Sequence, residues 1–202
     1  YNLAPRQEAP VLRVDSAGAR PCRRLAMLRW GLVPAWAKDA SLGDRMINAR
    51  AETVEDRPGF RAAFRQRRCL VLADGFYEWR GSAGQRMPYR FELEGRKPFA
   101  MAGLWESWTP REGGVIETFA IITTDANQTV APIHHRMPAI IPPAAYPAWL
   151  GEDAAEPKEL KALLRPYQGE DMHAYGVSPR INKAAYDDVS VLERHQGTAQ
   201  LL

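Results

Sequence analysis

The chain has 202 residues, of which 46% are hydrophobic and 25% are charged, values typical of a globular domain. No stretch approaches the roughly 20 apolar residues of a transmembrane helix, so we expect no membrane association. The formal charge of +3 does not by itself indicate a polyanionic partner, but arginine heavily outnumbers lysine. Arginine suits bidentate contact with phosphate, although a GC-rich coding sequence enriches arginine as well.

We expect residues 1–202 to form a single domain, because a chain of this length can bury a full core. Two cysteines do not make a disulfide framework and no secretory leader begins the chain, which favours a reducing cytoplasm. Cys69 lies in an apolar run and is expected to be a small buried side chain. The opening Tyr1-Asn2-Leu3-Ala4-Pro5 is typical of the interior of a protein, so we expect further residues upstream.

The predicted elements are short, because 16 prolines are spread along the chain. Residues 11–14 and 25–30 are predicted strands, 34–43 a loop that carries Trp36, and 60–65 a short helix that begins near Pro58. Aromatic and branched residues predict strands at 69–72, 76–80, 89–93, 99–108 and 117–124, separated by turns at 81–84, 94–96 and 112–114. The remaining predictions are a strand at 137–141, helices at 144–150 and 157–164, and a last strand at 173–177.

The close spacing of these strands favours antiparallel hairpins over βαβ units. We therefore predict an α+β fold with a mostly antiparallel, barrel-like sheet, a few short peripheral helices and a central cleft. Three segments carry side chains suited to binding a polyanion, such as single-stranded DNA, or to catalysis: residues 47–53, 74–79 and 133–138.

In the first segment, an extended chain would point Asn48 and Arg50 to the same side. The alternative is a turn with a solvated arginine.

In the second segment, Glu78 lies in an aromatic strand, either solvated at the edge of a sheet or held in a cleft of low dielectric constant. In a cleft its pKa would rise and it could act as a general acid or base. The Trp79 ring could stack on a base or pack in the core.

In the third segment, the adjacent His134 and His135 are expected to point to opposite faces of an extended chain. No third ligand has a metal-like spacing, so we predict no metal site. One imidazole beside Arg136 suits proton transfer next to a phosphate, and a purely structural histidine is the alternative.

The three segments belong to a longer series of motifs that covers nearly the whole chain. The series is Tyr1-Asn2-Leu3-Ala4-Pro5, Trp30-Gly31-Leu32-Val33-Pro34-Ala35-Trp36-Ala37, Ile47-Asn48-Ala49-Arg50-Ala51-Glu52-Thr53, Arg68-Cys69-Leu70, Ala73-Asp74-Gly75-Phe76-Tyr77-Glu78-Trp79, Ala102-Gly103-Leu104-Trp105-Glu106, Thr118-Phe119-Ala120-Ile121-Ile122-Thr123-Thr124 and His134-His135-Arg136-Met137-Pro138. In this order the motifs resemble the SOS-response-associated peptidase (SRAP) domain, whose members bind abasic sites in single-stranded DNA.

The resemblance implies that the nucleophile is a cysteine at the mature amino terminus, in a Met-Cys-Gly-Arg start whose initiator Met the protein removes itself. An α-amine has a pKa of about 7.7–8.0, against about 10.4 for lysine, so far more of it is unprotonated at neutral pH. The amine attacks the aldehyde of the opened abasic sugar, and the thiol then closes a thiazolidine crosslink. This cysteine is not in the chain, and an internal cysteine has no free α-amine, so the chain as given is expected to bind DNA without crosslinking it.

Residue by residue, the resemblance implies that Asn48 positions the terminal cysteine, Glu78 acts as acid and base, and His134 shuttles protons. The resemblance implies phosphate contacts by Arg50 and Arg136. Trp36 and Trp79 are candidates for packing or for stacking on bases, with Trp36 the preferred DNA contact, and Asn2, Pro5 and Thr123 are further expected DNA contacts. Two positions depart from the family pattern: His135, where an acidic residue is common, and Ala37, where some members have a second aromatic residue.

Two other functions stay open from the sequence. A thiol peptidase that acts on other proteins would use Cys69 with His134. A noncatalytic single-stranded-DNA-binding module would bind regardless of lesions, with an affinity that falls steeply as salt rises. For the SRAP-like function we expect a cytoplasmic monomer that joins the nucleoid during DNA repair, has abasic single-stranded DNA as its partner and needs no cofactor.

Overall fold

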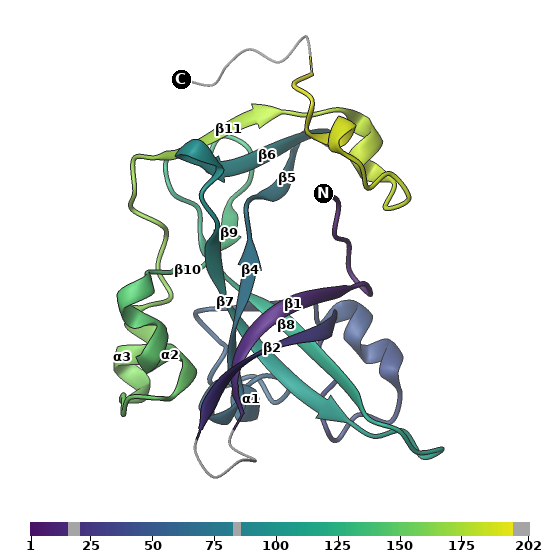
Figure 1. Cartoon of the computed structure of the whole chain (residues 1–202), viewed down its shortest axis with the longest axis vertical. Coiled ribbons are helices and arrows are strands. Elements are labelled where there is room, and N and C mark those ends of the chain that lie inside the picture. The colour runs from purple at the N-terminus through teal and green to yellow at the C-terminus, as the bar shows by residue number, and fades with distance from the viewer. Residues whose placement is uncertain (16–20, 83–85, 196–202) are drawn as a thin grey trace.

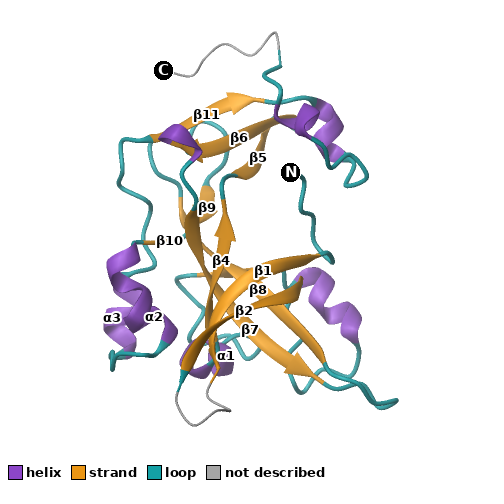
Figure 2. Cartoon of the chain, in the orientation of Figure 1, coloured by secondary structure: helices purple, strands orange, loops and turns teal. Residues whose placement is uncertain are grey.

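The computed structural model describes residues 1–15, 21–82 and 86–195. Its strands form an eight-stranded sheet and a three-stranded sheet, and the smaller sheet lies at one end of the molecule (Figure 1). The first residues of the chain run between the two sheets (Figure 2). Among the described residues, no helix is both long and apolar enough to cross a membrane.

The larger sheet contains β1 (Glu8–Asp15), β2 (Cys22–Trp30), β3 (Asn48–Arg50), β4 (Arg68–Ala73), β7 (Phe99–Trp108), β8 (Ile116–Asp125), β9 (Arg136–Pro138) and β10 (Ile140–Ile141). The smaller sheet contains β5 (Phe76–Arg80), β6 (Met87–Leu93) and β11 (Met172–Gly176). The α-helices of the described residues are α1 (Arg61–Gln66), α2 (Tyr146–Leu150) and α3 (Pro157–Ala162). Single 3₁₀ turns are η1 (Ala40–Arg45), η2 (Glu94–Arg96), η3 (Pro143–Ala145), η4 (Pro179–Asn182) and η5 (Val189–Leu192).

Five strands of the larger sheet close into a ring, in the pairing order β1, β2, β8, β7, β4 and back to β1. The ring is not a true barrel, since β2 and β8 pair only at Arg29–Thr118 and Trp30–Phe119. The predicted α+β fold with a mostly antiparallel, barrel-like sheet is confirmed. Two pairs depart from the antiparallel majority: β2–β8 and β3–β8 are parallel, because long connections let β8 enter beside them in the same direction.

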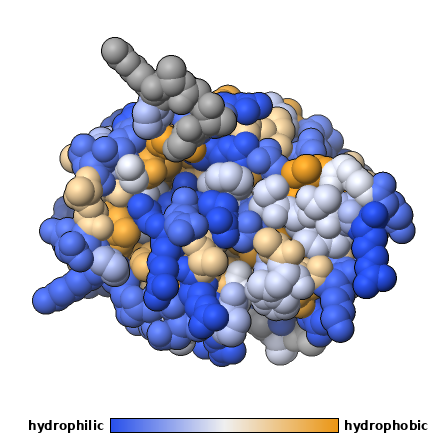
Figure 3. Space-filling view, turned by 90° about the horizontal axis from the view of Figure 1, so that it is seen from below, coloured by the Kyte–Doolittle hydropathy of each residue, from blue (hydrophilic) through white to orange (hydrophobic). Residues whose placement is uncertain are grey.

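Side chains on β4, β7 and β8 alternate between two cores. On β4, Cys69 and Val71 face the core inside the ring, while Leu70 faces an outer core that helices α1, α2 and α3 cover. Cys69 has no exposed surface, which confirms it as a buried hydrophobic side chain. The end of the molecule away from the smaller sheet is mostly hydrophilic, with apolar side chains in separate patches (Figure 3).

One predicted strand, at 137–141, is in fact two. At Ala139 the backbone N–H donates to Ile122 of β8, while the carbonyl accepts from Ala102 of β7. The chain therefore changes partner there, from β8 for β9 to β7 for β10. Among the predicted turns, 81–84 lies partly outside the described residues, and 94–96 is the turn η2.

The smaller sheet is joined to the ring through the inner core. The rings of Phe76 on β5 and Phe91 on β6 stack with centroids 4.9 Å apart, and both belong to the same cluster as the residues inside the ring. A third cluster, built around Val177, Ile181 and Val191, packs against the aromatic side chains of β5 and β11. The C-terminal turns thus cover the smaller sheet beside the first residues of the chain.

Candidate functional site

A cleft of about 880 Å³ lies between the two sheets. Its walls come from residues 1–5, from Ile47 and Asn48, from the whole run 71–79, and from residues of β8, β9 and the C-terminal turns. Residues from all three segments singled out in the sequence line it, the third through Pro138, and His134 of that segment contacts the lining residue Glu78. The predicted central cleft is therefore present.

Glu78 and His134 face each other at this cleft. The Oε2 atom of Glu78 lies 3.4 Å from Nδ1 of His134, and both side chains are mostly buried. The same Nδ1 lies 3.2 Å from the backbone nitrogen of Arg136, which donates to it, and 3.0 Å from the carbonyl oxygen of Arg136. The backbone of Arg136 thus fixes the orientation of the imidazole toward Glu78.

Burial decides between the two interpretations of Glu78 that the sequence left open. It raises the pKa of Glu78 to about 7, a shift that the nearby His134 partly opposes. A carboxyl with this pKa is protonated in about half of the molecules at neutral pH, so it can both give and take a proton. Glu78 is therefore not a solvated edge residue, although β5 is an edge strand of its sheet.

Asn48 and Arg50 share one face of β3, as the alternation predicted, with Ala49 buried between them. Parallel pairing sets Asn48 beside Ile121 and Arg50 beside Thr123, and antiparallel pairing sets Thr123 beside Pro138. Paired residues project to the same side of a sheet, and Asn48, Ile121, Thr123 and Pro138 line the cleft, so this face forms its floor, with Arg50 on the same face beyond the lining. Both side chains are exposed, and no carboxylate among the described residues forms an ion pair with Arg50.

Arg136 differs from Arg50, because its guanidinium is already occupied. Its NH1 group donates to Glu52 and Asp125, each at 2.8 Å, and its NH2 group donates to Glu52 at 3.0 Å and to the carbonyl of Thr123 at 2.6 Å. The side chain is 13% exposed. A phosphate could reach this guanidinium only by displacing a carboxylate, so the phosphate contact of Arg136 stays a prediction.

The two adjacent histidines do not point to opposite faces, and that prediction was wrong. Their rings lie 4.6 Å apart, tilted by 45°. The reason is local: the backbone N–H groups of Ile133 and His134 both donate to the carbonyl of Val130, so the chain turns here instead of extending. In the parts of the chain that the structure describes, no group of three or more His, Cys, Asp or Glu residues could hold a metal ion.

Two residues expected to contact DNA hold the fold together. The Asn2 amide donates to the carbonyls of Ile181, Lys183 and Tyr186 at 3.0–3.2 Å, and its side chain is buried. The Trp79 indole donates to the Asn182 side chain at 2.7 Å and packs on the C-terminal cluster. Both line the cleft, but the side-chain N–H donors of both are used within the protein.

Of the other residues predicted to contact DNA, two line the cleft and one lies outside it. Pro5 and Thr123 line the cleft, and the Thr123 hydroxyl donates to the carbonyl of Ala49 at 3.4 Å. Trp36 lies outside the cleft lining, with 63% of its surface exposed. An exposed indole of this kind is available for stacking, so the sequence hypothesis for Trp36 stays a prediction.

Sequence reasoning missed a buried cation that lines the cleft. Arg90 on β6 is 2% exposed and donates to Glu92 at 2.9 Å, to the carbonyl of Asp74 at 3.1 Å and to the Tyr77 hydroxyl at 3.3 Å. The signal that could have found it is the charged pair Arg90 and Glu92, two residues apart in an otherwise apolar strand.

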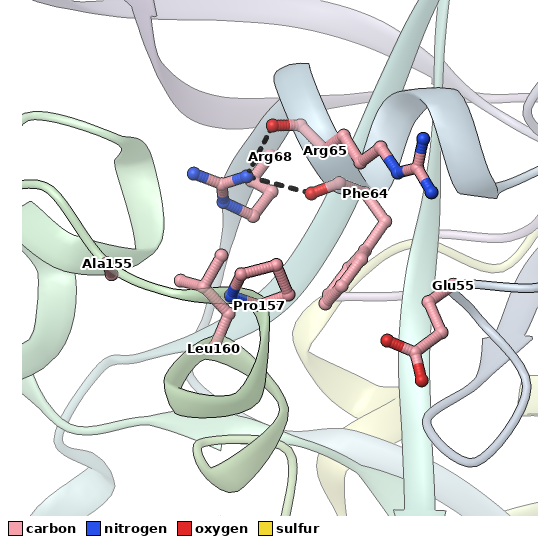
Figure 4. A pocket seen from close by; sticks show the side chains of 7 residues that line it. All are labelled: Glu55, Phe64, Arg65, Arg68, Ala155, Pro157 and Leu160. Atoms are coloured by element: carbon pink, nitrogen blue, oxygen red, sulfur yellow. Dashed lines mark hydrogen bonds between the residues drawn. The ribbon is translucent and has the colours of Figure 1, made fainter.

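A second, smaller hollow of about 300 Å³ lies between α1 and α3 (Figure 4). Its most buried cation is Arg68, which donates to the carbonyls of Phe64, Arg65 and Trp149. These carbonyls lie in the last turns of α1 and α2, where helices lack internal partners. Arg68 is thereby used to cap two helix ends, and this hollow is structural.

Comparison with known proteins places the chain in a family. The chain matches the family model described as SOS response associated peptidase (SRAP) over residues 1–184. It is 41% identical over 196 residues to the abasic site processing protein YoqW of Bacillus subtilis (strain 168), which covers 96% of this chain and 86% of that protein. It is 33% identical to the abasic site processing protein HMCES of Gallus gallus, over 93% of this chain and 63% of that protein. The crystal structure of a protein from Bacteroides thetaiotaomicron is similar with a TM-score of 0.82 and 30% identity, over 95% of this chain and 82% of that one.

Proposed function

The chain belongs to the SOS response associated peptidase (SRAP) family, and from that premise we propose that it binds abasic sites in single-stranded DNA and becomes covalently linked to them. Relatives in two kingdoms are named abasic site processing proteins, which supports the choice of lesion. The observation that carries the proposal is the pair of Glu78 and His134, 3.4 Å apart at a cleft along which the first residues of the chain run.

The proposed nucleophile is a cysteine at the mature amino terminus, upstream of Tyr1, exposed by removal of the protein's own initiator Met. Its α-amine adds to C1′ of the ring-opened sugar, and loss of water gives an imine. The thiol then adds its sulfur to the imine carbon and its proton to the nitrogen, which closes a thiazolidine. One water leaves in total, and no oxidant, reductant or metal takes part.

Glu78 is proposed to move the protons of this sequence. Opening the sugar requires a proton on the ring oxygen and removal of one from the 1′-hydroxyl, and forming the imine requires a proton on the departing water. A carboxyl with a pKa of about 7 can perform both steps near neutral pH. His134, whose Nδ1 faces Glu78, is proposed to exchange a proton with it between the steps.

The floor of the cleft is proposed to hold the DNA strand. Arg50 lies on the same face as Asn48 and forms no ion pair with a carboxylate of the described residues, so it can bind a backbone phosphate bidentately while Asn48 orients the incoming nucleophile. Arg136 is proposed to act next to them, with its phosphate contact in competition with Glu52 and Asp125.

The rival function as a thiol peptidase through Cys69 has little support. The Cys69 side chain is wholly buried, and burial raises the pKa of its thiol far above the ordinary value, so it is neither reachable nor ionised. A Cys69→Ser protein is expected to keep full crosslinking activity.

The proposal is tested by incubating the full-length protein with matched abasic and intact oligonucleotides, followed by a denaturing gel. We expect an SDS-resistant adduct with the abasic strand only. Binding to both strands alike, without adduct, would instead identify a noncatalytic single-strand-binding module.

A further inference from the structure

The first residues of the chain are held at two points, one on each side of the Tyr1–Asn2 peptide bond. The hydroxyl of Tyr77 donates to the carbonyl oxygen of Tyr1 at 2.8 Å. The Asn2 side chain is fixed by three carbonyls of the C-terminal turns, and the Asn2 backbone N–H donates to Asp187 at 2.7 Å. Both Tyr1 and Tyr77 line the cleft.

The Tyr77 side chain is itself held in place by Arg90. Antiparallel pairing sets it opposite Arg90, so the two side chains lie on the same face, and the Arg90 guanidinium is 5.6 Å from the centre of the Tyr77 ring. The NH1 group of Arg90 donates to the Tyr77 hydroxyl at 3.3 Å. Because the hydroxyl accepts this bond, its own proton is directed to Tyr1. Burial raises the pKa of Tyr77 above its ordinary value, so the hydroxyl keeps that proton.

Arg90 is fixed in turn by acidic and main-chain groups. It donates to Glu92 at 2.9 Å and pairs with Asp74 at 3.0 Å. It also packs against the turn before β5, where a Cβ on Gly75 would lie 2.6 Å from its Cζ atom. The series Glu92, Arg90, Tyr77 and the Tyr1 carbonyl therefore connects a buried cation to the main chain in the cleft.

We propose that Tyr77 is a positioning residue, whose hydroxyl fixes the Tyr1 carbonyl so that the residues upstream of Tyr1 are directed into the cleft. The inference rests on the proposed function, in which the nucleophile lies upstream. An extended residue spans at most ~3.3–3.6 Å, so a cysteine three residues before Tyr1 would stay within roughly 10 Å of this anchor. Removal of the anchor would lower the effective concentration of the nucleophile at the lesion without changing the DNA-binding floor.

The test compares two tyrosine variants of the full-length protein. Tyr77→Phe removes the hydroxyl and keeps the ring above Arg90. Tyr175→Phe is the matched control, because its hydroxyl lies 3.3 Å from Glu92 in the same network but is not bonded to Tyr1. For each, we would measure hydrogen–deuterium exchange of peptides from residues 1–7, the rate of adduct formation, and affinity for a strand with a tetrahydrofuran abasic analogue that cannot open.

We expect Tyr77→Phe to increase exchange in residues 1–7 and to slow the adduct about tenfold, the effect of one lost hydrogen bond, with an unchanged affinity for the analogue. Tyr175→Phe should change none of these more than twofold. Wild-type exchange and a wild-type rate in Tyr77→Phe would overturn the inference. If the wild-type protein formed no adduct, the proposed function would fail, and exchange alone would then decide whether Tyr77 anchors the segment.

Discussion

At the scale of single residues, the central feature is one carboxyl group whose environment sets its chemistry. The sequence identifies Glu78 as a carboxylate within an aromatic strand, but it does not predict whether this carboxylate is protonated at neutral pH. The side chain is mostly buried and faces His134, which is 56 residues away in the chain. Burial of this kind depends on tertiary contacts that strand alternation does not contain.

Replacement of Glu78 by Gln should remove proton transfer and leave the shape of the cleft. We expect the rate of adduct formation to fall about 10²-fold or more, with a similar affinity for the strand. The wild-type rate should change near pH 7, where Glu78 titrates, and the variant should lack this inflection. Glu94→Gln, at an exposed turn, is the control and should keep the wild-type pH profile.

The raised pKa of Glu78 also predicts a change in stability. The folded protein holds this proton up to about pH 7, whereas the unfolded chain releases it near 4.5. The native state therefore binds more protons between these values, and stability falls as pH rises through this window. Glu78→Gln should raise the free energy of unfolding at pH 8 by up to about 3 kcal/mol and change it little at pH 4, as measured by urea denaturation. An equal effect at both pH values would show that Glu78 does not carry a raised pKa.

Arg50 and Arg136 have the same side chain but different surroundings. Arg50→Ala should weaken binding of single-stranded DNA several-fold and lower the slope of log affinity against log salt by about 1, because one phosphate contact is lost. Fluorescence anisotropy at several salt concentrations measures both quantities. Arg111→Ala, in the exposed turn between β7 and β8, is the control. Equal losses in the two variants would indicate general charge attraction and no site at Arg50.

At the scale of elements, β5 and the turn before it depend on a glycine. A Cβ at position 75 would meet the guanidinium of Arg90 at 2.6 Å and the carbonyl of Phe91 at 2.8 Å, and neither group can move away. We expect Gly75→Ala to lower the free energy of unfolding by about 2 kcal/mol or more. Gly59→Ala should cost much less, since the closest atom there is the flexible end of Met46. Thermal denaturation of the two variants would measure the difference.

Most helices and strands could be predicted from local sequence patterns, but the strands with which each strand pairs could not. The strands β5 and β7 begin and end at the predicted residues, because aromatic and branched side chains bounded by turn residues indicate a strand directly. The parallel pairing of β3 with β8 and the change of partner at Ala139 depend on hydrogen bonds between distant segments. The turn that brings His134 and His135 together is local, since Ile133 and His134 both donate to the carbonyl of Val130, and an extended chain was the wrong assumption there.

At the scale of the whole molecule, the site exists because two sheets are joined by one core. The larger sheet supplies Asn48, with Arg50 on the same face of β3, while the smaller sheet supplies Glu78 and Tyr77. Motif order identified most of these residues, since a family preserves the order of its motifs. Arg90 was missed because its burial and its contacts with Asp74, Tyr77 and Glu92 depend on the pairing of β5 with β6.

The central claim, covalent attachment through an amino-terminal cysteine, is tested most directly by intact-mass spectrometry. The full-length protein, with its mature terminus verified by mass, would be incubated with an abasic oligonucleotide without any reducing agent. We predict a species whose mass is the sum of protein and oligonucleotide minus one water, absent with an intact strand. A verified cysteine terminus that yields only the unmodified masses would contradict the account.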